Sequence, residues 1–491
     1  MLVEDLMIKS GVKFGTSGAR GLASEITDQI SYAYTTAFLQ HLEANNEINP
    51  GSQMALAGDL RPSTDRIMAA SAKAIADKGY EPINGGKVPS PAVALHGITN
   101  QIPTVMVTGS HIPDDRNGIK YTKASGEILK KDELGIKAQD VNWDESLFDE
   151  NGMFKQAYTL AEVDPAIEEN YINRYLDFFG PDALKGIKIG LYQHSAVGRH
   201  TLSKIYKGMG ADLVELGFSD TFIPVDTEAI RDEDTRLANQ WAQENSYASI
   251  LSTDGDSDRP LISDENGKWL RGDVAGILCA QYLKATTVAT PVSCNSSLEK
   301  CGLFPNISRT QIGSPFVISA MNQAADGEMV IGYEANGGFL MNTDFTNNGK
   351  VLKALPTRDA VILHIAIILL AKDKQTSVSG LVGELPQRFT ASNRLQDYPT
   401  EESQKKLALF TQGKDSENTQ IIEETFGSIS GKVQSTDLTD GLRITFANSE
   451  VIHLRPSGNA PELRCYNEAD SEERVLEMNQ LCMNVLNQWK G

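Results

Sequence analysis

Short apolar runs that end in polar, glycine-containing loops alternate along most of the chain with segments of helical periodicity. The clearest runs cover residues 52–59, 104–108, 186–194, 246–253 and 329–334. Strands that alternate with helices of about 10–15 residues predict βαβ units with right-handed crossovers. The hydrophobic pattern therefore indicates an α/β fold with mixed or parallel sheets.

Two stretches repeat one unit of strand, helix, glycine and second strand. They cover residues 52–86, with Arg61 after the first strand, and residues 186–217, with Arg199 at the same place. A weaker third copy covers residues 286–313. The repeat distance exceeds 100 residues, which favours three related α/β layers over a solenoid.

The last hundred residues follow a different pattern. Short strands are expected at 441–446, 451–455 and 463–466, and a long helix closes the chain. That helix is expected to begin at Asp470, with Glu473 three residues later in a start that resembles a capping box. Its apolar positions from Val475 to Trp489 fall on one face. Strands followed by a helix predict a small α+β domain.

Composition narrows the function classes. The chain has 491 residues and a formal net charge of −20, which argues against nucleic acid or an anionic membrane as partner. The longest apolar run, residues 360–371, is too short to span a bilayer, and the first residues carry no secretory pattern. Five cysteines without metal-ligand spacing suit a reducing compartment. We therefore expect a cytoplasmic location.

The most informative segment covers residues 104–120, which read TVMVTGSHIPDDRNGIK. A predicted strand leads into Ser110 and His111, followed by a polar loop that is expected to turn at residues 117–118 and to end on Lys120. A hydroxyl at the carboxyl end of a buried strand, with an imidazole and an ammonium nearby, suits a nucleophile. The alternative is a surface loop with an incidental serine.

An acidic loop follows the strand in residues 246–260. Asp254, Asp256 and Asp258 alternate there, so their oxygens can converge on one hard cation, Mg²⁺ or Ca²⁺. An EF-hand is excluded because Arg259 stands where the sharp turn needs glycine, a strand precedes the loop, and residues 264–267 look like a hairpin turn. A solvated acidic turn stays open as the alternative. Arg259 favours metal, since a cation beside a bound ion suits an anionic ligand shared by both.

A third predicted strand opens into residues 335–338, which read ANGG. Glu334 and Asn336 could bind adjacent hydroxyl groups there, and the glycines permit close backbone approach. A glycine-rich turn with a capping glutamate is an equal alternative for this loop.

The segment 451–466 reads VIHLRPSGNAPELRCY and joins two strands. Guanidinium groups with small polar side chains and backbone N–H groups form a cradle for a dianion, here from Arg455, Ser457, Asn459 and Arg464. Near the N-terminus, residues 14–21 contain too many glycines for a strand interior. That loop is expected to wrap a reactive centre and to offer Arg20 to a phosphate.

Five motifs together, FGTSGARG, TGSHIPDDRNGIK, DGDSDR, GYEANGG and RPSGNAPELR, resemble the phosphomannomutase/phosphoglucomutase (α-D-phosphohexomutase) family. They follow the family's order and spread from Phe14 to Arg464. The resemblance implies three related α/β domains with mixed sheets and a C-terminal α+β domain around a central cleft. The domains expected on this basis are 1–155, 165–272, 273–385 and 395–491.

The same resemblance implies roles for the candidate residues. Ser110 would be the phosphoserine, and Asp254, Asp256 and Asp258 would hold Mg²⁺ together with an oxygen on Ser110. The groups expected around the phosphoserine are Arg20, His111 and Lys120, with Lys120 and Arg20 as the candidates for proton transfer. The substrate would be bound by Arg259, by Glu334 and Asn336 on the sugar, and by Arg455, Ser457, Asn459 and Arg464 on the phosphate that is not transferred.

This chain departs from the family pattern at several positions. Gly109 stands where alanine is usual, Ile112 replaces an asparagine, and Asn459 replaces a common threonine. Gly338 stands where many bacterial relatives carry a histidine with an acid–base role, so that role is in question here.

The reaction implied is the interconversion of mannose 6-phosphate and mannose 1-phosphate through a phosphoserine enzyme and a hexose 1,6-bisphosphate, which also serves as activator. The alternatives within the family are a phosphoglucomutase and an enzyme that accepts both sugars. Outside it, a metal-dependent phosphomonoesterase and a sugar-phosphate-binding protein stay open. We expect a phosphorylated hexose as ligand and a monomer or small homo-oligomer.

Overall fold

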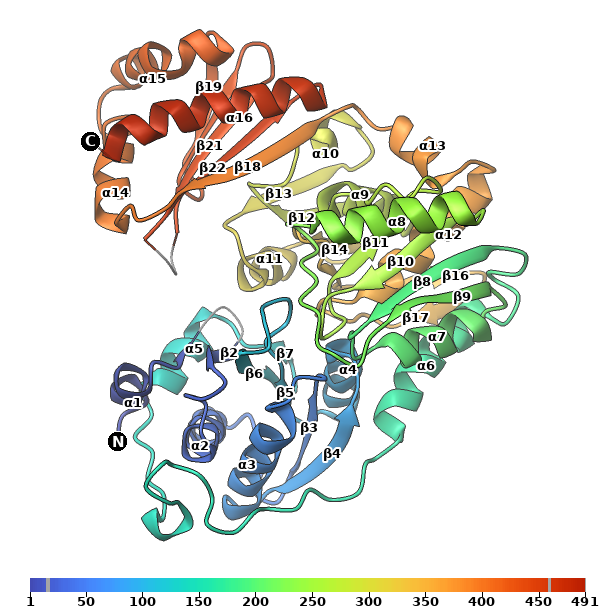
Figure 1. Cartoon of the computed structure of the whole chain (residues 1–491), viewed down its shortest axis with the longest axis vertical. Helices are drawn as coiled ribbons and strands as arrows, with labels where there is room; N and C mark the ends of the chain where they lie inside the picture. The colour runs from blue at the N-terminus through green and yellow to red at the C-terminus, as the bar shows by residue number, and fades with distance from the viewer. Residues whose placement is uncertain (15–17, 458–460, 491) are drawn as a thin grey trace. The chain divides into compact units, whose positions relative to one another are not determined.

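The computed structural model describes residues 1–14, 18–457 and 461–490. The chain divides into two compact units, one of Met1–Ala285 with Met321–Leu381 and one of Thr286–Ala320 with Val382–Gly491. Each unit is built from α/β or α+β layers, and the elements can be followed in Figure 1.

The N-terminal part of the first unit is a mixed sheet in the order β1-β2-β6-β5-β3-β4, with β7 paired to β6. Strand β3 runs parallel to β4 and β5, whereas β1, β2, β6 and β7 pair antiparallel with their neighbours. The strands are β1 (Lys13–Phe14), β2 (Gly18–Leu22), β3 (Gln53–Gly58), β4 (Glu81–Lys87), β5 (Thr104–Val107), β6 (Arg116–Lys123) and β7 (Gly126–Glu127). The helices are α1 (Val3–Ser10), α2 (Asp28–Ala44), α3 (Thr64–Asp77), α4 (Ser90–Asn100) and α5 (Lys130–Lys137).

A second mixed sheet in this unit has the order β11-β10-β8-β9. Its strands are β8 (Lys188–His194), β9 (Asp212–Phe218), β10 (Ser249–Thr253) and β11 (Pro260–Ile262), with helices α6 (Ala166–Phe179), α7 (Arg199–Gly208) and α8 (Asp232–Glu244). The other elements of the first unit are α9 (Gly272–Tyr282), β14 (Val330–Tyr333), β15 (Phe339–Met341), β16 (Phe345–Asn347), β17 (Lys350–Leu352) and α12 (Ala360–Lys374). Short 3-10 turns and α13 (Val378–Gly383) complete the connections.

The three predicted repeats are all β-α-β units with parallel strands. Strand β3 pairs in parallel with β4, β8 with β9, and, in the second unit, β12 (Thr287–Pro291) with β13 (Asn306–Thr310). The third copy is weak because its helix, α10 (Ser297–Lys300), has only four residues.

The apolar run at 360–371 forms α12, whose residues from Ala360 to Ala371 are buried. This helix packs against α9 inside the first unit. Among the residues that the structure describes, no helix combines the length and the apolar character needed to cross a membrane.

The C-terminal part of the second unit is an antiparallel sheet in the order β18-β22-β21-β20-β19. Its strands are β18 (Phe389–Leu395), β19 (Val433–Asp437), β20 (Leu442–Phe446), β21 (Val451–Pro456) and β22 (Leu463–Ala469). The helices of this unit are α11 (Ser314–Met321), α14 (Thr400–Ala408), α15 (Asp415–Ser430) and α16 (Glu472–Asn487), and α16 packs against β18 and β22 (Figure 1).

The closing helix was predicted with the right buried face but a slightly early start. Ser471, not Asp470, is the N-cap, and its hydroxyl accepts the amide N–H of Arg474. Val475, Met478, Cys482 and Leu486 are buried in the core of the second unit. The one-residue shift follows from the serine, whose hydroxyl reaches the first turn from an extended backbone.

Candidate active site

Ser110 lies just beyond the end of β5, in a strained backbone conformation. Its φ of 58° is in the left-handed region that non-glycine residues seldom adopt, and its side chain is fully buried. The hydroxyl of Thr108 accepts the Ser110 amide N–H at 2.8 Å and donates to Asp59 at 2.7 Å. The fold therefore holds the serine in one orientation at the carboxyl end of a buried strand.

The three aspartates of the acidic loop follow β10 and meet Ser110. Their carboxylate oxygens lie within 4.8 Å of one another, and all three side chains are buried. The hydroxyl of Ser110 donates to Oδ2 of Asp254 at 2.6 Å. Gly255 permits this approach, because a Cβ there would lie 2.6 Å from the Ser110 carbonyl oxygen. The structure thus brings the serine and the acidic loop together, as the sequence predicts.

Lys120 reaches the same carboxylates from β6. Its ammonium donates to Asp256 at 2.5 Å and to Asp258 at 2.8 Å, and the side chain is 16% exposed. Burial would lower the pKa of Lys120, but the two carboxylates outweigh it and raise the pKa. Lys120 is therefore a cation at neutral pH.

The pKa values of Asp254 and Asp256 are shifted in opposite directions. Burial, reinforced by Asp256 and Asp258, raises the pKa of Asp254 well above its ordinary value. Burial also opposes ionisation of Asp256, but Lys120 and the Ser90 hydroxyl, which donates at 2.6 Å, lower the pKa of that carboxyl. Mutual repulsion of crowded carboxylates raises the pKa of Asp254 even though Arg259 and Lys120 oppose that rise.

His111 and Arg259 form the side of the site next to the serine. Nη1 of Arg259 donates to Nδ1 of His111 at 2.7 Å, and that Nδ1 lies 3.4 Å from the Ser110 hydroxyl. Burial and Arg259 lower the pKa of His111 to about 4, against the opposing charge of Asp226. The imidazole is neutral at pH 7 with its proton on Nε2, because an arginine can only donate. Arg259 lies 3.9–4.0 Å from carboxylate oxygens of Asp258 and Asp254.

Arg61 is a buried support of the serine loop that the sequence prediction did not include. Its side chain is fully buried, pairs with Asp59, and donates to the carbonyl oxygens of Ser110, at 2.9 Å, and Ile112. The guanidinium lies 4.1 Å from the ring centre of Phe222. In the sequence Arg61 marks only the repeat, at the place equivalent to Arg199. Its position directly after a strand end could nevertheless have indicated a residue of the site.

Glu334 and Asn336 lie in the tight turn after β14. The Glu334 amide donates to the Gly338 carbonyl at 3.0 Å, and the Asn336 side-chain oxygen accepts the Gly338 amide at 2.9 Å. Burial raises the pKa of Glu334, while Arg358 and Arg259 oppose that rise. Thr227 donates to the Asn336 carbonyl at 2.6 Å, which ties this turn to the loop before α8.

Arg20 and its surroundings differ from the expected loop. Residues 18–22 are strand β2, and Asn117 and Gly118, predicted as a turn, are inside strand β6. Both predictions were wrong because the glycines allow strands β2 and β6 to approach closely. A Cβ at Gly118 would lie 2.6 Å from the Ala19 carbonyl oxygen. The Arg20 side chain is exposed and interacts electrostatically with Arg259 and Asp256. Residues 15–17 of that motif lie outside the described residues.

The phosphate-loop candidates belong to the second unit. Arg455 on β21 and Arg464 on β22 are direct cross-strand partners, and Arg394 on β18 is the partner of Arg464 on its other side. Arg455 donates to Asp440 at 2.7 Å, and Ser457 is buried at the end of β21. Asn459 lies outside the described residues. Arg394, Arg464 and Arg455 thus form a row of three cations on one sheet face, beside which Glu462 lies 3.4 Å from Arg394. Arg394 was missed because no motif contains it.

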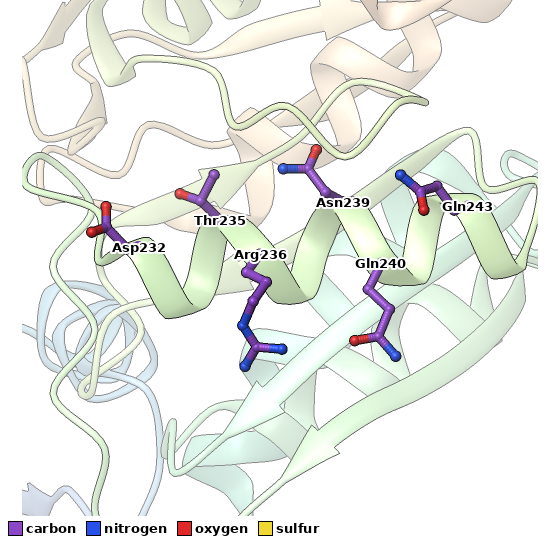
Figure 2. A pocket seen from close by; sticks show the side chains of 6 residues that line it. All are labelled: Asp232, Thr235, Arg236, Asn239, Gln240 and Gln243. Carbon is purple, nitrogen blue, oxygen red and sulfur yellow. The ribbon is translucent and has the colours of Figure 1, made fainter.

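A separate pocket of about 480 Å³ runs along α8 and is lined by Asp232, Thr235, Arg236, Asn239, Gln240 and Gln243. Figure 2 shows these side chains leaving the helix in different directions rather than converging on one point. None of the candidate residues lines it, so we do not assign function to this pocket.

Family models match the chain over most of its length. Those of phosphoglucomutase/phosphomannomutase α/β/α domains I, II and III match residues 11–145, 169–267 and 271–389, and that of the C-terminal domain matches 403–484. The chain has the four-domain α/β architecture with mixed sheets and belongs to the phosphoglucomutase/phosphomannomutase family. It is therefore an enzyme of the phosphotransferring mutase class.

Two similar relatives are both called phosphomannomutase. The protein of Salmonella muenchen is 43% identical over 470 residues, covering 96% of this chain and 94% of that protein. The protein of Sinorhizobium fredii is 41% identical over 479 residues, covering 97% and 99%.

Solved structures share the fold at low identity. A phosphoglucomutase/phosphomannomutase family protein from Burkholderia thailandensis has a TM-score of 0.73 at 16% identity, with 97% of each chain covered. The phosphoglucomutase parafusin from Paramecium has a TM-score of 0.70 at 14% identity, covering 96% of this chain and 95% of that chain.

Proposed function

We propose that this protein interconverts mannose 6-phosphate and mannose 1-phosphate through a phosphorylated Ser110 and a hexose 1,6-bisphosphate. The observation that carries the proposal is the 2.6 Å contact between the buried Ser110 hydroxyl and Asp254, beside Asp256 and Asp258. Such a juxtaposition suits phosphoryl transfer, in which positioning and charge neutralisation supply most of the catalysis.

The acidic loop fits a divalent cation. Oδ1 of Asp256 and Oδ1 of Asp258 are buried and make no hydrogen bond to any described residue. Buried carboxylate oxygens without a partner are costly, and an oxygen-only donor set suits Mg²⁺. We propose that Asp254, Asp256, Asp258 and an oxygen on Ser110 hold Mg²⁺, which when bound neutralises charge on the phosphoryl group.

The other residues divide the proton and charge chemistry. When the sugar hydroxyl attacks, the bond from Ser110 Oγ to phosphorus breaks and a bond from the sugar oxygen to phosphorus forms. Over the step one proton moves from the sugar hydroxyl to the serine oxygen: Lys120, a cation, suits donating a proton to the leaving serine oxygen and regaining one from the sugar hydroxyl, with Arg20 at the exposed side of the site. His111 is neutral at pH 7 and, with Nδ1 held by Arg259, packs beside the serine as a positioning group. Arg259 adds a fixed positive charge.

The phosphate that is not transferred needs a separate site. We propose that Arg455, Ser457, Asn459 and Arg464 bind it, as the resemblance implied, and that Arg394 belongs to the same group. The cross-strand row of arginines supports this assignment because it concentrates positive charge in a chain of net charge −20. Glu334 and Asn336 are proposed to bind the sugar hydroxyls.

Mannose is proposed as the sugar because two relatives above 40% identity bear the name phosphomannomutase. Glucose phosphates are the second candidate, since the two sugars differ only at the C2 hydroxyl. Parallel turnover of mannose 1-phosphate and glucose 1-phosphate, with Mg²⁺ and a trace of hexose 1,6-bisphosphate as activator, tests the preference. Equal or faster turnover of glucose 1-phosphate would contradict it.

The same assay separates the mutase from the two other classes. A phosphomonoesterase releases inorganic phosphate, whereas a mutase interconverts isomers without net release. A sugar-phosphate-binding protein has no turnover, and its ligand affinity is unchanged by Ser110→Ala. Interconversion that Ser110→Ala abolishes is the expected result.

The domain division and cellular setting belong to the same proposal. We propose domains at 1–155, 165–272, 273–385 and 395–491, in a cytoplasmic enzyme that is a monomer or small homo-oligomer. Limited proteolysis tests the division, since cleavage concentrated near residues 156–164 and 384–388, which lie outside helices and strands, is expected.

A further inference from the structure

Arg358 is a buried arginine at the start of α12 that none of the five motifs contains. The side chain is 7% exposed, and its neighbours fix its backbone on both sides. The hydroxyl of Thr357 donates to Glu127 at 2.7 Å. Asp359 caps α12 and accepts the hydroxyls of Tyr171, at 2.7 Å, and Tyr175. The guanidinium therefore starts from a rigid base.

That guanidinium spans the metal loop and the sugar loop. Its Nε lies 3.2 Å from Oδ2 of Asp258, and its Nη1 lies 3.7 Å from Oε2 of Glu334. Gly338 makes room for it, because a Cβ at that position would lie 2.7 Å from Cδ and 2.9 Å from Cγ of Arg358. Gly338 does not have a positive φ, so the demand for glycine comes from the arginine and not from the backbone.

The polar atoms between the two loops are incompletely bonded. Nε of Arg358 and Oε2 of Glu334 are buried, yet neither makes a hydrogen bond to any described residue. A guanidinium carries five donors and a carboxylate accepts at both oxygens. A sugar hydroxyl of a ligand could donate to Oε2 of Glu334, and a hydroxyl or phosphoryl oxygen of the same ligand could accept from the guanidinium.

We propose that Arg358 is a substrate-positioning residue, which orients the Glu334 carboxylate toward the sugar and places a fixed positive charge between the sugar loop and the metal loop. This inference rests on the proposed function, because it takes the ligand to be a hexose phosphate. Burial raises the pKa of Glu334, and Arg358 is the foremost cation opposing that rise. Without the guanidinium the Glu334 carboxyl would ionise less readily, and it would then be poorly suited to accept hydrogen bonds from sugar hydroxyls.

The competing interpretation is an ion pair that only stabilises the fold. Both interpretations predict some loss of melting temperature in Arg358→Met, but only positioning predicts weaker sugar-phosphate binding in a correctly folded protein. Asp258 keeps its contact with Lys120 in that variant, so its carboxylate is not left unpaired.

The test measures binding and turnover separately. In the Ser110→Ala background, which cannot be phosphorylated, calorimetric titration with mannose 1-phosphate should show an affinity at least about 10-fold weaker in Arg358→Met and partly restored in Arg358→Lys. In the Ser110 enzyme, kcat/KM should fall by about 100-fold with Met and less with Lys. Gly338→Ala, which displaces the guanidinium without removing it, should give a smaller loss in the same direction.

Arg66→Met is the matched control. Arg66 pairs with Asp28 at 2.9 Å and donates to the Ala23 and Ile26 carbonyls, so this variant also removes a partly buried ion pair, and none of these partners is a candidate site residue. The inference is overturned if Arg358→Met keeps the affinity and kcat/KM of the control, or if both variants lose them equally. Absence of interconversion in the unaltered protein would instead contradict the proposed function, so the two failures are distinguishable.

Discussion

Alanine at position 109 should lower both the stability and the turnover of this enzyme, because the space its methyl group needs is filled by Arg61. A Cβ on Gly109 would lie 2.8 Å from Cζ and Nε of Arg61 and 2.9 Å from Nη2. Real Cβ contacts essentially never fall below 3.0 Å. Gly109 does not have a positive φ, so alanine meets no backbone penalty there and the clash alone decides the outcome.

The size of the effect follows from how Arg61 is held. The guanidinium pairs with Asp59, donates to two carbonyl oxygens and lies over the Phe222 ring, so it cannot withdraw without losing contacts. Overpacking costs about 1–3 kcal/mol, and one lost charged hydrogen bond about 1.5–3 kcal/mol. We therefore expect a loss of about 2.5–6 kcal/mol in the free energy of unfolding and a melting temperature lower by roughly 4–8 °C.

Turnover should fall more than binding. Arg61 donates to the carbonyl of Ser110, so a shift of the guanidinium moves the strained serine, and a displacement of about 1 Å costs about 100-fold in rate. The assay compares kcat, KM and melting temperature of Gly109→Ala with those of Gly427→Ala. Gly427 lies in α15, where a Cβ would meet its nearest neighbour at an ordinary 3.6 Å.

A double-mutant cycle with Arg61→Lys checks the cause. Because the two positions compete for one space, the cost of Gly109→Ala should shrink when the guanidinium is absent. Wild-type turnover and melting temperature in Gly109→Ala, or strictly additive costs in the cycle, would refute the reasoning.

Three further predictions concern the metal loop, the arginine row and a buried histidine. Asp256→Asn keeps the shape but removes a charge, so calorimetry should show Mg²⁺ affinity at least about 10-fold weaker; unchanged affinity contradicts the metal assignment. Arg394→Gln should raise KM several-fold with little change in kcat, and an unchanged KM excludes Arg394 from the phosphate site. Burial lowers the pKa of His364 to about 3 in the folded protein. In the unfolded chain the same imidazole takes up a proton near pH 6.5, whereas in the folded protein it stays neutral down to about pH 3. The contribution of His364 to the free energy of unfolding is therefore complete above pH 6.5 and is lost as the pH falls toward 3. At pH 5.5 the free energy of unfolding is lower by about 1.4 kcal/mol for this reason. Urea midpoints at pH 7.5 and 5.5 should show a weaker pH dependence in His364→Gln than in the exposed control His200→Gln, and equal dependence would contradict this.

Much of the fold could be predicted from periodicity because the strands and the helix of each β-α-β repeat are neighbours in the sequence. The parallel pairs β3/β4, β8/β9 and β12/β13 each lie within one short stretch of chain, where alternation and helical spacing are decisive. The acidic loop and Ser110 could also be placed, since both follow strand ends. By contrast, Asn117 and Gly118 have the local preference of a turn, yet pairing with β2 keeps them in a strand. The local preference for a turn is outweighed where a strand distant in the sequence supplies the backbone hydrogen bonds of a sheet.

The groups that could not be predicted are side chains that enter the site from other parts of the chain. Arg61 and Arg358 carry no motif of their own, and only the tertiary structure brings them against Gly109 and Gly338. Both glycines are positions where this chain departs from the family pattern, and in both cases an arginine fills the space that a side chain would need, with its guanidinium at Gly109 and with its methylene stem at Gly338. Each departure is therefore one half of a pair of residues, and its effect can be understood only together with the arginine that occupies the gap. Substituting either glycine toward the family pattern should cost activity as long as its arginine is present.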